Sequence, residues 1–115
     1  MIKTKYILNK ECTPDLLEED GFRFNYGMER WIRLYPVLFY QGKQHTPVVF
    51  LKAVIDLEER DFSYFIVNGQ GDLDSTYYSD YGRKDTYVTK IDKNVTKVLR
   101  RLCFAEIIEK KEKIK

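Results

Sequence analysis

Alternation of apolar and polar positions dominates the middle of the chain. Phe22, Phe24 and Tyr26 recur at every second position, and the segments that follow are rich in aromatic and β-branched residues. This pattern is typical of β-strands. Strands are predicted over 22–26, 30–41, 48–57 and 61–68. Their short connections favour an antiparallel meander, and Pro36, which has no N–H, should lie at an edge or in a bulge.

The period changes to that of a helix near the C-terminus. From Thr86 to Cys103 the apolar residues fall within one arc about 100° wide, and basic residues occupy the opposite arc. The apolar arc holds Val88, Ile91, Val95, Val98, Leu99 and Leu102. An amphipathic helix that covers the sheet is therefore expected over 86–103. It should end near Cys103, because Glu106 would otherwise enter the apolar arc.

Helix-capping signals surround residues 13–20. Thr13 can cap a helix, Pro14 suits its first position, and Gly21 can close its last turn. Shorter strands are expected over 3–8, 76–78 and 104–108, and a polar, frayed tail is expected from about residue 109. Together these elements predict a single α+β domain over 1–115, with one antiparallel sheet of about five strands.

Composition agrees with a folded protein that does not cross a membrane. The 115 residues are 43% hydrophobic and 33% charged, and no apolar run approaches the roughly 20 residues that a spanning helix needs. The first ten residues lack the apolar stretch of an export signal. We therefore expect a cytoplasmic protein.

No motif predicts a catalytic or metal site. The acids after Asp72 do not follow the EF-hand pattern, and the only histidine, His45, has no identifiable partner. Cys12 and Cys103 lie far apart and are expected to be reduced thiols. The acids around Asp56 should sit at a solvated hairpin tip. We expect no cofactor and no enzymatic activity, although a site assembled from distant residues stays an alternative.

Positive charge is concentrated near the C-terminus. Residues 83–115 hold 11 Lys and Arg against 5 Asp and Glu, although the whole chain carries only +2. Five cations share one face of the expected helix: Lys90, Lys93, Lys97, Arg100 and Arg101. Such a stripe can follow a row of phosphates or meet an acidic partner, but exposed helix faces are also commonly lysine-rich.

Tyrosines gather just before this helix. Tyr77, Tyr78, Tyr81 and Tyr87 flank Arg83 and Lys84. Tyrosine and arginine are typical of protein interfaces, and tyrosine rings can also stack on unpaired bases. The alternative is that several of these rings pack under the loop as core. Trp31 is assigned to the core or the sheet surface and not to a ligand platform.

The compact layout resembles small accessory proteins of phages and mobile elements of Gram-positive bacteria. The resemblance is carried by residues 8–10, 16–22 and 99–102, and by the lysine- and tyrosine-rich style of the chain. It implies a binding or inhibitory role. We therefore expect a non-enzymatic binding protein that contacts a host protein through the tyrosine-rich loop. The alternative is a nucleic-acid-binding protein that uses the basic helix face, and pairing of two copies through an edge strand is also open.

Overall fold

The computed structural model describes residues 4–40, 46–79 and 86–111. Its strands are β1 (Tyr6–Leu8), β2 (Arg23–Asn25), β3 (Arg30–Phe39), β4 (Pro47–Asp56), β5 (Asp61–Asn68) and β6 (Ile108–Lys110). Its helices are α1 (Pro14–Asp20), α2 (Ser75–Tyr78) and α3 (Thr86–Phe104). The four strands of the meander form one antiparallel sheet in the order β2-β3-β4-β5.

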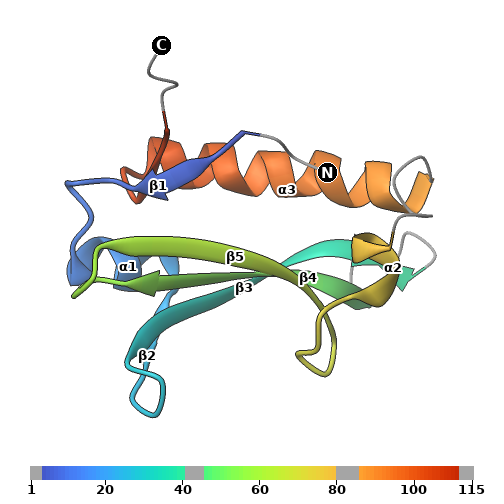
Figure 1. Cartoon of the computed structure of the whole chain (residues 1–115), viewed down its shortest axis with the longest axis horizontal. Helices are drawn as coiled ribbons and strands as arrows, with labels where there is room; N and C mark the ends of the chain where they lie inside the picture. The colour runs from blue at the N-terminus through green and yellow to red at the C-terminus, as the bar shows by residue number, and fades with distance from the viewer. Residues whose placement is uncertain (1–3, 41–45, 80–85, 112–115) are drawn as a thin grey trace.

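The chain folds into two layers (Figure 1). One layer holds α3 together with β1 and β6, and the other is the four-stranded sheet. The core lies between them, because Leu51, Ala53 and Ile55 alternate along β4 toward α3 and are fully buried. The predicted apolar arc of α3 is confirmed, with Val88, Ile91, Val95, Leu99 and Leu102 all buried.

The prediction of a single five-stranded sheet is wrong. The first strand does not join the meander but pairs with the last, with Leu8 opposite Ile108 and Tyr6 opposite Lys110. The reason is that β6 follows α3 after only three residues, which keeps it in the helix layer, where β1 pairs with it. The tail predicted to fray from 109 is therefore partly ordered, since Glu109 and Lys110 belong to β6.

Both longer helices end by the same hydrogen-bonding pattern. In α1, Gly21 takes a left-handed conformation (φ 104°), and the N–H of Phe22 donates to the carbonyl of Leu17 at 2.9 Å. In α3, Glu106 takes that conformation (φ 61°), and the N–H of Ile107 donates to the carbonyl of Leu102 at 3.0 Å. These are Schellman motifs, and they confirm the ends predicted for both helices.

The prediction of a short strand over 76–78 is wrong. These residues form α2, because the Asp74 carboxylate caps the helix by accepting from the N–H of Tyr77 at 3.2 Å. The β-propensity of threonine and tyrosine favoured a strand here, and the local cap overrides it.

The interruption expected at Pro36 is confirmed. The pairing of β3 with β4 shifts register between Pro36 and Leu38, and on the other side of β3 the pairing with β2 reaches no further than Ile32. Pro36 therefore lies where β3 has a described neighbour on one side only. The Asn94 amide of α3 donates to the carbonyl of Val37 at 2.9 Å, so a helix side chain occupies part of this edge.

Candidate functional site

Tyr77 belongs to the core and not to the surface that the sequence predicted. Its side chain is only 3% exposed, and its hydroxyl donates to the Asp92 carboxylate of α3 at 2.5 Å. Burial and this hydrogen bond raise the pKa of the Tyr77 phenol. The ring therefore fastens α2 to α3.

Tyr78 and Tyr87 also make internal hydrogen bonds. The Tyr78 hydroxyl accepts from the backbone N–H of Ile66 at 2.8 Å, on the outer edge of β5. The Tyr87 hydroxyl donates to the Asp74 carboxylate at 2.8 Å. Burial raises the pKa of both phenols. The other members of the predicted surface, Tyr81, Arg83 and Lys84, lie outside the described residues.

The basic face of α3 is divided in two. Lys90, Lys93, Lys97 and Arg100 are exposed. Arg101 instead donates to the Asp20 carboxylate at 3.0 Å, which also accepts from the Tyr35 hydroxyl at 2.6 Å and from Arg33 at 3.0 Å. Arg101 therefore holds α3 against the end of α1.

Three of the exposed lysines surround one shallow hollow. Lys90, Lys93 and Lys97 line it together with Leu38 and Phe39, and its volume is about 280 Å³. Within the described residues these lysines form no ion pair. Their charge is therefore available to an anionic group from outside.

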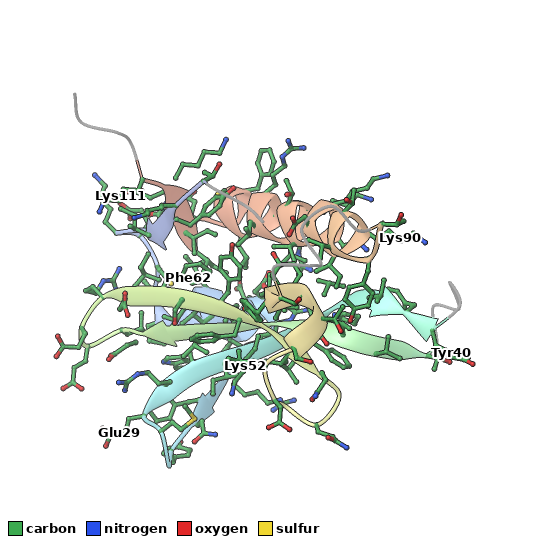
Figure 2. The ribbon with its side chains drawn as sticks, turned by 45° about the vertical axis from the view of Figure 1, so that its right-hand side comes forward. Glu29, Tyr40, Lys52, Phe62, Lys90 and Lys111 are labelled. Carbon is green, nitrogen blue, oxygen red and sulfur yellow. The ribbon has the colours of Figure 1, made fainter. Side chains whose placement is uncertain are left out.

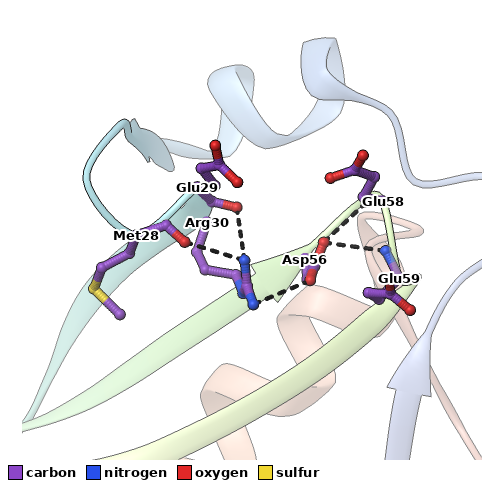
Figure 3. A network of polar contacts seen from close by, with 6 residues as sticks. All are labelled: Met28, Glu29, Arg30, Asp56, Glu58 and Glu59. Carbon is purple, nitrogen blue, oxygen red and sulfur yellow. Dashed lines mark hydrogen bonds and ion pairs between the residues drawn. The ribbon is translucent and has the colours of Figure 1, made fainter.

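The Asp56 carboxylate holds the turn of the β4–β5 hairpin. Asp56 is only 8% exposed, and its carboxylate accepts from the N–H groups of Glu58 and Glu59 at 3.0 and 3.1 Å (Figure 3). Its second oxygen lies 3.3 Å from Arg30, which also donates to the carbonyls of Met28 and Glu29. The expectation that this carboxylate is solvated is thus wrong for Asp56, which ties two neighbouring turns together.

The thiols offer no activated nucleophile. Cys12 and Cys103 are both free, and Cys12 is buried. Burial raises the pKa of each, which disfavours the reactive thiolate. Among residues 4–40, 46–79 and 86–111, no three His, Cys, Asp or Glu side chains gather as a metal site would require.

The sheet carries a second apolar face on the side away from α3. Alternation places Ile32, Leu34 and Pro36 of β3 there, next to Phe50 and Val54 of β4. Phe65 extends the surface onto β5. Leu34 is 51% exposed and Phe65 is 41% exposed. We call this surface the open face: Ile32, Leu34, Pro36, Phe50, Lys52, Val54 and Phe65.

No described helix covers the open face. Figure 1 shows α3, β1 and β6 on the other side of the sheet, while the β2–β3 turn and the connection after β5 project beyond the open side. Figure 2 shows the same contrast, with Lys52 on the side turned away from α3 and Phe62 on the side of the helix layer.

Lys52 lies at the centre of the open face. It stands opposite Leu34 on one neighbouring strand and opposite Phe65 on the other. The rows on either side of it pair Ile32 with Val54 and Pro36 with Phe50. A single ammonium group is thus surrounded by apolar side chains, and within the described residues it forms no ion pair.

Sequence reasoning missed this surface although a signal was present. A sheet with one solvated face alternates apolar and polar residues, yet Phe50 and Val54 are apolar at the outward positions of β4. A nearly continuous apolar strand is typical of burial on both faces. On the outward face the described chain covers only one end, where Val67 stands opposite Phe50, is 2% exposed and bridges to Leu73 in the connection after β5.

The fold matches that of a solved structure. The crystal structure of a DUF1831 family protein from Lactobacillus plantarum superposes with a TM-score of 0.72, over 96% of this chain and 90% of that one, at 13% sequence identity. At this identity the likeness shows the fold alone. No protein-family model matches the chain, and no curated protein matches it. No helix in the described ranges has the length and apolar character that crossing a bilayer requires.

Proposed function

We propose that this chain is a non-enzymatic binding protein whose open face receives a protein partner. The observation that carries the proposal is the apolar surface on the side of the sheet that no described helix covers. Contiguous exposed apolar patches are uncommon on monomeric proteins and mark interaction sites. The resemblance of the sequence to small accessory proteins of phages and mobile elements favours a host protein as the partner.

The partner carries a carboxylate among apolar side chains. Lys52 sits in the middle of the open face, and docking removes it from water. A buried ammonium group is costly unless an opposite charge meets it. An Asp or Glu at the centre of the partner's surface provides that charge.

A second copy of the chain fits this surface less well. If two open faces stack around a twofold axis at their centre, the two Lys52 side chains approach each other. Like charges in a buried interface are repulsive, so a self-paired arrangement is disfavoured. We therefore propose a partner of different sequence.

A charge exchange tests the proposal. A tagged chain and its Lys52→Glu variant are compared in capturing a partner from their own cells, and cross-linking locates the partner segment that the open face contacts. We expect Lys52→Glu to weaken capture about tenfold or more, and replacement of the partner's acid by lysine to restore it. Lys97→Glu, on α3, serves as the matched control.

Three results would count against this function. They are undiminished capture by Lys52→Glu, an equal loss with Lys97→Glu, and a homodimer formed through the open face. Each places the interface elsewhere or assigns the surface to a second copy.

The second candidate function is nucleic-acid binding by α3. It is supported by the exposed, unpaired lysines around the hollow beside Phe39. Because neutralised phosphates release counterions, binding should fall steeply with salt. Charge reversal at Lys93 and Lys97 should abolish the binding of a single-stranded oligonucleotide. Binding that is insensitive to salt would reject this candidate.

A further inference from the structure

A cleft lies between α1 and β2, apart from the open face. Its volume is about 800 Å³. The lining residues are Pro14, Glu18, Gly21, Phe22, Arg23, Phe24, Tyr26 and Trp31. Trp31 alternates with Ile32 along β3, so the cleft and the open face lie on opposite sides of the β2–β3 hairpin.

Aromatic rings form one wall of this cleft. Phe24 packs edge-on against Tyr26 at 4.9 Å between ring centroids and against Trp31 at 5.4 Å. Tyr26 is nevertheless 85% exposed, so this ring does not serve the core. Three rings in contact, with the outermost in solvent, make a rigid apolar surface for another ring.

The polar atoms of this wall include hydrogen-bond donors without protein acceptors. Among the described residues, the Trp31 indole N–H and the Tyr26 hydroxyl donate to no protein group, and no buried side-chain polar atom lacks a partner. The Trp31 indole N–H is therefore accessible to solvent.

We propose that this cleft binds a proline-rich peptide segment in the polyproline II conformation. Such a segment offers flat apolar rings and backbone carbonyls that accept hydrogen bonds, and its prolines have no N–H to satisfy. The cleft offers the complement, which is an aromatic wall with donors from Trp31 and Tyr26. Aromatic grooves that recognise proline-rich segments use this chemistry.

One charged side chain narrows the choice of ligand. Glu18 enters the cleft from α1, whereas Arg23 pairs with Ile32, so alternation turns its side chain to the other side of the hairpin. The Glu18 carboxylate disfavours a phosphate group. A neutral peptide backbone tolerates this carboxylate, and a basic residue beside its prolines can pair with Glu18.

Tryptophan fluorescence tests the proposal directly, because Trp31 is the only tryptophan in the chain. The full chain is titrated with a synthetic peptide that carries two Pro-x-x-Pro repeats and a terminal arginine. We expect a saturable change in Trp31 emission. Tyr26→Ala should weaken binding about tenfold, as loss of an aromatic contact residue commonly does. Tyr40→Ala is the matched control, because Tyr40 is also exposed but does not line the cleft.

A second variant tests the orientation of the peptide. Glu18→Arg should reverse the preference, so that a peptide ending in glutamate binds better than the one ending in arginine. Several results would overturn the proposal: unchanged emission and unchanged amide NMR signals around the cleft at millimolar peptide, equal binding of a peptide with glycine in place of each proline, or equal weakening by Tyr40→Ala. Quenching of Trp31 by adenosine but not by the peptide would also overturn it, and would assign the cleft to a planar heterocycle.

Discussion

Phe65 and Ile66 are neighbours along β5 and face opposite sides of the sheet. Phe65 lies on the open face at 41% exposure, whereas Ile66 is fully buried against the helix layer. The two positions therefore separate residues available for binding from residues that hold the fold together.

Substitutions at these two positions should have very different effects on stability. Ile66→Ala leaves a cavity in the core, and we expect the free energy of unfolding to fall by about 2–5 kcal/mol. Phe65→Ala removes a half-exposed ring and should cost less than about 1 kcal/mol. Urea denaturation measures both. Equal losses would show that the open face is part of the core.

The Tyr77–Asp92 hydrogen bond should contribute measurably to stability. Tyr77→Phe removes only the hydroxyl, and hydrogen bonds to charged groups contribute about 1.5–3 kcal/mol. We expect a loss of that size by chemical denaturation. Tyr40→Phe is the control, since Tyr40 is largely exposed, and it should change the free energy of unfolding by less than about 0.5 kcal/mol. An unchanged free energy of unfolding for Tyr77→Phe would mean that this hydrogen bond does not hold α2 to α3 in solution.

Stability should decline in alkali. Burial and the hydrogen bond to Asp92 raise the Tyr77 pKa above that of an unfolded tyrosine, near 10. Below about pH 10 the phenol is protonated in both states, so its contribution is fully present. As the pH rises further, the unfolded chain releases this proton first, and the contribution is lost as the pH passes through the raised pKa.

The decline can be assigned to Tyr77 by comparison with a variant. Unfolding free energies at about pH 8 and about pH 11 should differ less for Tyr77→Phe than for the unmodified chain, because the variant lacks one of the phenols whose pKa is raised. An equal change in unfolding free energy between these two pH values for both proteins would contradict the assignment.

Glycine at position 106 should stabilise the protein. Glu106 adopts a φ of 61° at the end of α3, a conformation that costs residues with a side chain about 1–2 kcal/mol. Glu106→Gly removes this strain, and after the loss of chain entropy we expect a gain of about 0.5–1 kcal/mol.

The reverse substitution at the end of α1 should destabilise. Gly21 has a φ of 104°, and a Cβ there would lie 2.8 Å from the Arg33 guanidinium. Gly21→Ala should therefore cost at least about 1 kcal/mol, and thermal or urea unfolding measures both changes. A destabilised Glu106→Gly variant would contradict the Schellman geometry of α3.

Much of this fold was predictable because its signals are local. The period of α3, the alternation from Phe22 to Asn68 and the capping pair Thr13 and Gly21 act between residues that are close in sequence. The pairing of β1 with β6 joins opposite ends of the chain, and no local pattern encodes it. The 75–78 helix was missed because its signal, Asp74 as a cap, competes with strand-favouring residues.

The candidate site was less predictable than the fold. The counts of tyrosine and lysine were visible in the sequence, but the burial of Tyr77 against Asp92 and the pairing of the exposed Arg101 with Asp20 depend on tertiary structure. The open face became apparent only when register placed Leu34, Lys52 and Phe65 in one row. The proposed resemblance to phage and mobile-element proteins stays a prediction.

The proposed role of the open face is tested most directly by photo-cross-linking from two phenylalanine positions. A photoreactive phenylalanine analogue replaces Phe65 on the open face or Phe104 at the end of α3, and the native residue is an exposed phenylalanine at both positions. In the protein's own cells, we expect position 65 to cross-link to a distinct partner protein through a segment that contains Asp or Glu, and position 104 not to do so. Equal cross-linking from both positions, or cross-linking from position 65 only to other copies of the chain, would contradict the proposal.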